Sequence, residues 1–352
     1  MLYYWLLFFY FAVGALIAPA TKDYQKPRRT TPLLIFGALI TACLIGLRYR
    51  VGADWDTYVF IFSHAGSLDF WRSLQIGDPG YQALNWIVYN AGGDIWEVNL
   101  LCAAIFTWGL VRFCVAQENP WLALLVSIPY TVIVVAMGYT RQAVALGILM
   151  AGLASYLRGG GPIRFVMYVL VAVLFHKTAV VVVPLIAIGE SRNKLLSFLN
   201  FLFVLSMGIL LYDVFFGNAM DRFVQNYIQQ EYSSQGAAIR VAMNLVAAAL
   251  LFTMRHRLGF NERAYKLWRN FALASIGMLV LLFTLPSSTA VDRMSLYLLP
   301  LQIAVLASLP KGTKSEFGGS LAVVGYMAAV QFVWLTFAVH ANYWVPYRFF
   351  PI

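Results

Sequence analysis

Continuous apolar runs separated by short polar loops dominate the chain. A helix needs about 20 apolar residues to cross the roughly 30 Å apolar core of a bilayer, and only helices or closed barrels satisfy their backbone groups there. The runs are continuous rather than alternating, so the pattern predicts helices and excludes a barrel. They lie at about residues 2–19, 32–47, 96–116, 121–138, 141–157, 195–212, 237–254, 270–285, 294–309 and 320–338. We therefore expect an all-α protein: one integral membrane domain over residues 1–352, a polytopic transmembrane bundle of about ten full spans.

The composition agrees with a membrane protein, because 61% of the residues are hydrophobic and only 11% are charged. The net charge of +10 could indicate nucleic-acid binding, yet the basic residues lie in short loops between the apolar runs. That placement is typical of the Lys- and Arg-rich cytoplasmic loops of membrane proteins. The first run has no basic region before it and no small-residue cleavage site, so we expect a retained span. Membrane lipids are expected partners and nucleic acid is not.

The charges of the loops predict which side each one faces. The loop "TKDYQKPRR" after the first run is basic, which places it in the cytoplasm and the N-terminus outside. Counting along the chain, the loop 48–95 is external, 158–164 and 255–269 are cytoplasmic, and the C-terminus is external. The loops then carry a charge of about +11 inside and about −1 outside. Basic residues on the external side therefore need an explanation other than topology.

Residues 165–189 must enter and leave the membrane on the same side for these loops to stay consistent. The segment "FVMYVLVAVLFHKTAVVVVPLIAIG" predicts a hairpin of two short helices, each reaching only about 20 Å. His176 and Lys177 are then expected at its tip, inside the membrane and nearer the external face. There His176 is a candidate general base and Lys177 a candidate to neutralise a phosphate. The alternative is a polar tip that only hydrogen-bonds to neighbouring helices.

Ionisable residues gather near the external ends of the predicted helices. Such groups are costly at membrane depth and usually mark a binding site or a pathway. Arginine dominates among them, and its planar fork suits bidentate recognition of phosphate. The external polar residues are Arg48, Arg50, Asp54, Asp56, Asp78, Arg141, Gln142, Asp292, Arg293 and Arg348.

In "MGYTRQAVALG" one helix ends and an arginine opens the next. We expect Gly138 to break the preceding helix and Thr140 to cap the following one. Arg141 then stands at a helix N-terminus, whose free N–H groups and dipole favour an anion. The motif predicts a phosphate site; the alternative is an arginine that reaches out to lipid headgroups.

The stretch "RYRVGADWDTY" follows directly on the second apolar run. Its Gly52 permits a sharp turn away from the membrane edge. Two interpretations stay open for its charges. Asp54 and Asp56 either pair with the two arginines as a structural clasp, or the stretch presents a carboxylate base and an arginine clamp to a substrate.

Two further external segments are rich in aromatic residues. Residues 78–96 of the external loop 48–95 predict an amphipathic helix at the membrane interface, either a plain anchor or a lid that contacts substrate. The tail "HANYWVPYRFFPI" is typical of an aromatic belt. Its alternative role is to pack aromatic rings on sugars while Arg348 contacts a diphosphate.

Several kinds of chemistry leave no trace in the sequence. We find no Walker loop, dinucleotide fingerprint, HExxH motif or nucleophile elbow, so no nucleotide or other cofactor is expected. The external aspartates are scattered among arginines, which argues against a divalent-metal site. Cys43, Cys102 and Cys114 all fall within apolar runs, and we expect them to be buried packing residues rather than a disulfide or metal site.

In combination, four motifs resemble the EpsG-like family of exopolysaccharide polymerases, which is related in function to Wzy. They are "RYRVGADWDTY", "GYTRQAVALG", "FHKTAVVVVPL" and the terminal "PYRFF", and the resemblance runs from about residue 1 to 350. It implies a glycosyltransferase of the bacterial inner membrane. Such an enzyme joins oligosaccharide repeat units carried on undecaprenyl diphosphate at the periplasmic face and releases the lipid diphosphate. The implied partners are this lipid-linked donor, the growing exopolysaccharide or capsule chain, a chain-length regulator and a flippase.

The residues that match the motifs are Arg50, Gly52, Asp54, Tyr58, Arg141, Gln142 and His176. A polyprenyl diphosphate donor needs an apolar groove open to lipid and fixed cations for its negative charges. Positioned arginines can stabilise the charge on the leaving oxygen, and an acceptor hydroxyl needs a base, for which His176 or Asp54 is the candidate. The expected substrate-binding residues are Arg50, Tyr58, Arg141, Gln142, Lys177, Asp292, Arg293 and Arg348. Asp292 and Arg293 match no family motif and rest on their position alone.

Two other functions compete with the polymerase. A flippase or transporter of lipid-linked oligosaccharide would also bind diphosphate with arginines, but it should place polar residues along a central path, and no inverted repeat is apparent. An O-antigen ligase-type transferase would differ mainly in its acceptor. Such ligases typically carry a longer periplasmic loop late in the chain, whereas residues 213–236 form a short one.

Overall fold

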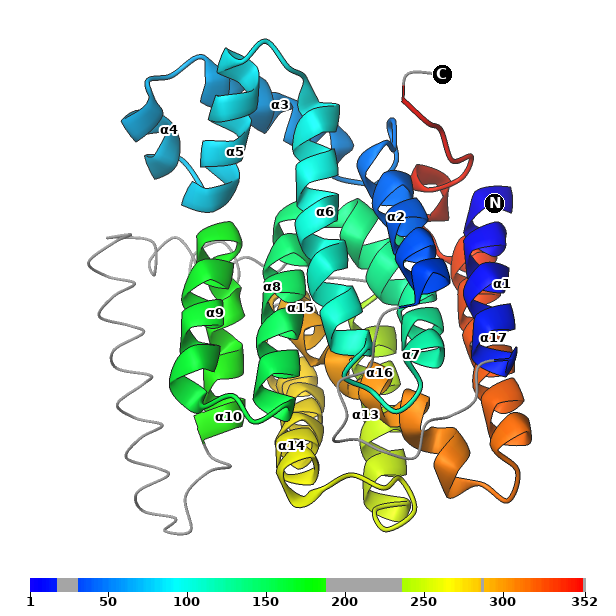
Figure 1. Ribbon diagram of the computed structural model, residues 1–352. Helices are drawn as coiled ribbons and strands as arrows, with labels where there is room; N and C mark the ends of the chain where they lie inside the picture. The colour runs from blue at the N-terminus through cyan, green and yellow to red at the C-terminus, as the bar shows by residue number, and fades with distance from the viewer. Residues whose placement is uncertain (18–30, 188–235, 286–287, 351–352) are drawn as a thin grey trace.

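The computed structural model describes residues 1–17, 31–187, 236–285 and 288–350 (Figure 1). Within these ranges the chain is helical, and its one β-type feature is an isolated antiparallel bridge between Arg48 and Phe349. The prediction of an all-α fold is confirmed. The predicted span 195–212, the loop 21–29 and the last two residues of the predicted hairpin lie outside the described residues.

Among the described residues, four helical segments are long and apolar enough to cross a membrane alone: Ile95–Cys114 (α6), Glu262–Thr284 (α14), Ser288–Gly312 (α15 to η5) and Glu316–Phe337 (α17). Six others are apolar but shorter: Leu2–Ile17 (α1), Pro32–Gly46 (α2), Pro120–Ala136 (α7 and η1), Pro162–Phe175 (α9), Lys177–Ile186 (η2 and most of α10) and Ala237–Thr253 (α13). The lengths therefore establish a helical membrane protein without fixing the predicted count of full spans.

Most helices begin or end close to the predicted apolar runs, and α14 is the main exception. It begins at Glu262, well before the predicted start at residue 270. Its first turns are polar, but the Asn261 side chain accepts a hydrogen bond from the Ala264 backbone N–H as an N-cap. Glu262 and Lys266 add an exposed ion pair one helical turn apart. Polar capping thus extends this helix beyond its apolar part.

The external loop predicted at 48–95 folds into three short helices: Trp55–Gly66 (α3), Phe70–Gln75 (α4) and Pro79–Asn90 (α5). The helix predicted within 78–96 is α5, and it buries one face through Tyr81, Asn85 and Val88. It ends at Asn90 because "AGGD" follows, where Gly92 has a φ of +82° that favours glycine. Figure 1 shows these helices grouped at the end of the bundle where both chain ends lie.

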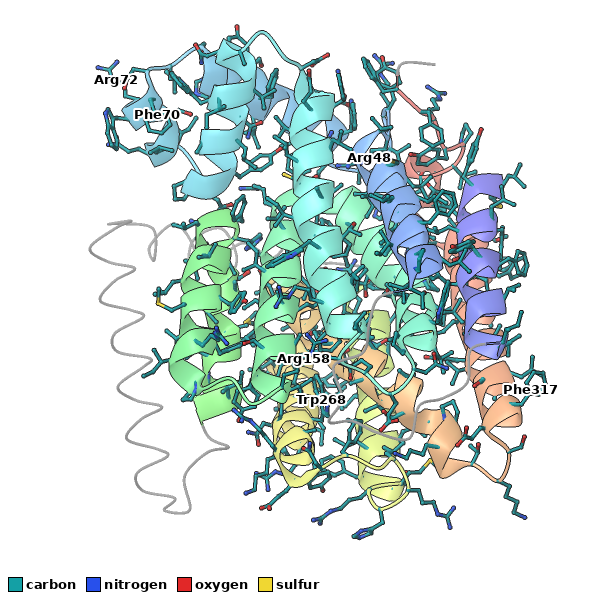
Figure 2. All side chains as sticks on the ribbon, viewed as in Figure 1. Arg48, Phe70, Arg72, Arg158, Trp268 and Phe317 are labelled. Atoms are coloured by element: carbon teal, nitrogen blue, oxygen red, sulfur yellow. The ribbon has the colours of Figure 1, made fainter. Side chains whose placement is uncertain are left out.

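Four connections gather at the opposite end. Lys311 Nζ donates to Glu118 Oε1 over 3.1 Å, which joins the α6–α7 loop to the α16–α17 loop. Arg263 Nη2 donates to the Gly160 carbonyl, which joins the start of α14 to the α8–α9 loop. Figure 2 shows Arg48 near the end that carries α3–α5 and Arg158 toward the other. The two groups of loops separated by the charge pattern therefore lie at opposite ends.

The helix Thr140–Leu157 (α8) forms the centre of the bundle, and nearly all of its side chains are buried. It packs between α6 and α9. It crosses α6 closely at Gly109 and Gly147, where a Cβ on either residue would collide with the backbone of the other helix. Because small residues let membrane helices approach closely, this crossing fixes the position of α8. The segment Leu299–Ser308 (α16) is likewise buried on all sides.

The chain reverses direction at His176, between α9 and the arm that returns along it. His176 has extended backbone between α9 and the 3₁₀ turn Lys177–Val182 (η2), which leads into Val183–Ala187 (α10). The returning arm contacts α9, and the Leu185 carbonyl accepts a hydrogen bond of 2.8 Å from Asn270 of α14. With 14 residues, α9 is about 20 Å long, shorter than the apolar core of a bilayer. His176 is therefore held at the end of a short arm inside the bundle.

Candidate functional site

Polar side chains from five separate segments converge beside the first turn of α8, below the helices of the external loop. They come from the starts of α3, α5 and α8, from the tip of the hairpin, and from Ser288–Ser295 (α15). We call this group the polar cluster: Asp54, Tyr58, Asp78, Arg141, His176, Lys177 and Arg293. All seven residues except Asp78 were predicted as site residues, and Asp78 was among the external polar residues.

Arg141 and Asp78 form the central ion pair of the polar cluster, with 2.7 Å between Nη1 and Oδ2. The Asp78 side chain is 5% exposed and that of Arg141 is 34% exposed. The Tyr58 hydroxyl is also within hydrogen-bonding reach of Arg141, and the backbone N–H of Lys177 donates to the Asp78 carboxylate. Burial raises the pKa of Asp78, while the charges of Arg141 and Lys177 oppose the rise. Asp78 thereby ties α5 and the hairpin tip to α8.

Asp54 lies half-buried at the N-cap position of α3 and makes no capping hydrogen bond with its side chain. Burial raises its pKa, and the charges of Arg293 and Arg141 act in the opposite direction. A carboxylate in such surroundings is suited to accept a proton nearer neutral pH. The structure therefore places the predicted base among the predicted cations.

His176, the other predicted base, is oriented by the residue two positions on. The Thr178 hydroxyl lies 2.8 Å from His176 Nδ1 and 3.3 Å from the Tyr297 hydroxyl. Nδ1 is therefore occupied, and within the described residues no side chain hydrogen-bonds to Nε2. The charges of Arg141, Arg293 and Lys177 all act on this ring. Nε2 is the ring nitrogen left for a substrate.

Arg293 lies on α15 with its guanidinium carbon 3.9 Å from the centre of the Tyr139 ring. Its carbonyl accepts a hydrogen bond of 2.6 Å from Gln142 Nε2. Gln142 thus holds the Arg293 backbone, a contact that sequence reasoning did not foresee. Among the residues that the structure describes, neither Arg293 nor Asp54 takes part in an ion pair. Arg293 is therefore a cation whose charge no described carboxylate neutralises at short range.

Arg240 of α13 is a residue that sequence reasoning missed. It forms a buried ion pair with Asp292, and its Nη2 donates to the Tyr139 hydroxyl over 3.4 Å. Its guanidinium also lies 5.7 Å from the Tyr139 ring, which Arg293 contacts as well. Asp292, predicted as a substrate-binding residue, uses its carboxylate on Arg240. The available signal was the arginine itself, because a charge within an apolar run usually has a partner in the bundle.

Arg48 has a structural role different from both interpretations of its motif. It is 1% exposed and donates to the Ile45 carbonyl, to Asn99 Oδ1 at 3.0 Å and to Thr140 Oγ1 at 2.7 Å. The predicted cap at Thr140 is therefore wrong, because its hydroxyl serves Arg48 and Tyr139 stands at the N-cap position. The break between helices falls on Tyr139, one residue after the predicted Gly138.

The clasp between the aspartates and the arginines, one of the two interpretations left open for this motif, is not found among the described residues. None of the ion pairs between described residues joins Asp54 or Asp56 to Arg48 or Arg50. The chain turns at Gly52, whose φ is +103°, and a Cβ there would collide with the Met137 carbonyl. This turn carries the aspartates into α3 and away from the arginines.

Arg50 and Arg348 lie at the edge of the bundle, and both are exposed. Arg50 stacks on Tyr49, whose backbone N–H donates to the Arg348 carbonyl over 2.9 Å. The C-terminal segment is anchored here by Trp344, whose Nε1 donates to the Ile133 carbonyl. The two arginines are almost 300 positions apart in the sequence. None of the described contacts joins either side chain to the polar cluster. The structure thus separates them from the other predicted phosphate ligands.

The polar cluster suits an anion. Arg141, Lys177 and Arg293 supply three positive charges against the carboxylates of Asp54 and Asp78. The N-terminus of α8 adds the positive end of an 18-residue helix, and its N-cap makes no side-chain hydrogen bond. Within the described ranges, no three His, Cys, Asp or Glu side chains converge to hold a metal ion. The arrangement can therefore bind a phosphate group next to two candidate bases.

The three cysteines are free thiols. Cys102 and Cys114 are buried as predicted, but the prediction is wrong for Cys43, which is exposed on α2. An exposed position on an outer apolar helix satisfies the same hydropathy pattern as a buried one, because lipid can take the place of protein.

Comparison with known proteins identifies the family of the chain. No curated protein and no solved structure matches the chain significantly. The sequence model of the EpsG family matches residues 32–349, which include every residue of the polar cluster together with Arg240 and Asp292. The chain therefore belongs to the EpsG family, a family of Wzy-like polysaccharide polymerases.

Proposed function

We propose that this protein polymerises undecaprenyl-diphosphate-linked oligosaccharide repeat units into exopolysaccharide or capsule and releases undecaprenyl diphosphate. Membership of the family supports the class of reaction. The observation that carries the proposal is the position of Arg141. It opens α8, pairs with Asp78, and shares with Arg293 and Lys177 the space around His176.

The reaction needs three functions, and the polar cluster offers a group for each. An acceptor hydroxyl oxygen forms a bond to the anomeric carbon of the donor sugar, while the bond from that carbon to the diphosphate oxygen breaks. The leaving diphosphate takes the bonding electron pair, and Arg141, Arg293 and Lys177 stabilise its charge. The acceptor proton passes to Asp54 or to Nε2 of His176.

We place the polar cluster at the periplasmic face of the inner membrane, with both chain ends on the same side. The support is the charge of the loops. The end opposite the cluster carries basic residues such as Arg158, Arg255, Arg257 and Lys311, as cytoplasmic loops do. The product would then leave into an aqueous compartment without crossing the membrane again.

Polymerisation fits the described residues better than transport does. A transporter needs polar groups along a path between the two faces. The polar cluster lies at one end of α8, while Ala143 to Met150 continue the helix as a buried apolar stretch. A ligase-type transferase would share the donor chemistry and differ in its acceptor, so the length of the product is what separates it from a polymerase.

The experiment is complementation of a strain that lacks this chain. We expect Arg141→Ala to abolish long polymer on gels and to accumulate lipid-linked single repeat units. Arg72→Ala is the matched control, because Arg72 is an exposed arginine on α4 of the same external loop, and its one ion pair with a described residue joins it to Asp69, three positions earlier. A normal chain-length ladder in the Arg141→Ala strain, at equal protein level in the membrane, would contradict the proposal.

A further inference from the structure

An apolar groove of about 580 Å³ runs along the outside of the bundle between α6, α8 and α9. Its walls include Ala104 and Trp108 of α6 and Met167 and Val171 of α9, and Ile148 of α8 lies in its floor. Trp108, Met167 and Val171 are each about half exposed, so the groove opens to the surroundings of the bundle. Its size lies within the range of ligand sites, roughly 300 to 1,000 Å³.

The groove leads to the polar cluster along two helices. On α9, the lining residues follow one face of the helix up to Phe175, the residue next to His176. On α8, Ile148 lies seven residues after Arg141, which is about two turns and the same helix face. At 1.5 Å per residue this separation is about 10 Å. One end of the groove therefore meets the candidate phosphate site.

We propose that this groove holds the hydrocarbon chain of the polyprenyl diphosphate, with its diphosphate bound at Arg141 and Arg293. The inference rests on the proposed function. The complementarity of the two parts supports it, because an apolar channel open to lipid ends at a cluster with more cations than carboxylates. A water-soluble ligand would find no polar partner on the apolar walls, whereas a hydrocarbon chain from the bilayer packs against them through van der Waals contacts.

The residue at the other end of the groove suggests a competing occupant, an ordinary phospholipid. Arg164 lines it there, at the start of α9 and next to the basic loop of the opposite face. A phospholipid of that leaflet would place its headgroup at Arg164 and its acyl chains in the same groove. The two occupants differ in which arginine they need and in their response to an excess of ordinary phospholipid.

The test measures binding to the purified full chain in detergent with two probes, radiolabelled undecaprenyl diphosphate and inorganic diphosphate. Ala104→Trp and Val171→Trp each fill the groove with a large ring at a different wall. Ala329→Trp is the matched control, an exposed alanine on the outer helix α17 away from the groove. We expect each groove variant to weaken undecaprenyl diphosphate binding about tenfold or more, with inorganic diphosphate binding changed less than twofold and the control unchanged.

The outcomes separate this inference from the proposed function. Binding of undecaprenyl diphosphate at wild-type affinity by both groove variants would overturn the groove while leaving the diphosphate site intact. Failure of the wild-type protein to bind either probe would count against the proposed function itself. Displacement of bound undecaprenyl diphosphate by an equal amount of phosphatidylglycerol would assign the groove to ordinary phospholipid. Loss of undecaprenyl diphosphate binding in Arg164→Ala but not in Arg141→Ala would lead to the same assignment. Unfolding temperatures of all variants confirm that each is folded.

Discussion

The Arg141 guanidinium donates to the Asp78 carboxylate over 2.7 Å and so joins the first turn of α8 to the start of α5. The two residues are 63 positions apart, and one opens the central helix α8 while the other belongs to the external loop. The contact therefore couples the position of the α3–α5 helices to the candidate phosphate site. An arriving diphosphate would compete with Asp78 for the same guanidinium.

Asp78→Ala should destabilise the protein by about 1 to 3 kcal/mol, because it leaves a partly buried arginine without its carboxylate. Asp69→Ala is the comparison, since it breaks an exposed arginine pair of the same loop and should cost less than about 1 kcal/mol. Unfolding in detergent, followed by intrinsic fluorescence, measures both. Equal effects of the two substitutions would mean that the Arg141–Asp78 contact adds no stability of its own.

Arg240→Ala should destabilise the protein by about 3 to 5 kcal/mol, more than Asp78→Ala, because it removes the guanidinium from a buried ion pair with Asp292. The double variant Arg240→Ala with Asp292→Asn should recover part of this loss, since the side chain at position 292 then no longer carries the charge that Arg240 neutralised. A double-mutant cycle on unfolding free energies measures the coupling. Additive effects of the two substitutions would show that the ion pair is not the source of the loss.

The apolar pattern was enough to predict an all-helical membrane protein, because hydropathy reflects the solvent around each residue. It also led to Arg141, His176 and Asp54, since charged residues beside apolar runs are conspicuous. It did not reveal which residues are partners. One interpretation paired Arg48 with nearby aspartates, yet its acceptors include Asn99 and Thr140, which only helix packing brings close.

Arg240 is a second residue whose partners the apolar pattern did not reveal. Its partner Asp292 is 52 residues away, and the aromatic ring it shares with Arg293 belongs to a third segment. Composition and periodicity carry no information about such pairings. The local geometry of Gly52, in contrast, was predictable, because only a residue without a side chain suits both its positive φ and its close approach to Met137.

Arg293→Ala should lower the rate of polymerisation about 100-fold or more while leaving the unfolding temperature within a few degrees of the wild type. The first effect follows from removing a cation that stabilises the leaving diphosphate. The second follows because Arg293 makes no ion pair with the described carboxylates, so its removal leaves no buried charge behind. Arg293→Lys should recover little activity, since lysine lacks the planar fork. A variant that loses stability in proportion to activity would point to a structural role instead.

The dependence of the rate on pH should distinguish the two candidate bases. Burial raises the pKa of Asp54 above its ordinary value of about 3.9, and a base works only when ionised. If Asp54 accepts the proton, polymerisation by the purified protein should increase with pH through this raised pKa and level off above it. Asp54→Asn should abolish turnover. Asp54→Glu should retain activity, but the rise of the rate with pH (the acid limb of the profile) should fall at a different pH. His176→Gln should then weaken the reaction without moving the limb. An acid limb that persists in Asp54→Asn and disappears in His176→Gln would assign the proton to Nε2 of His176, and Asp54 would be left to orient Arg293.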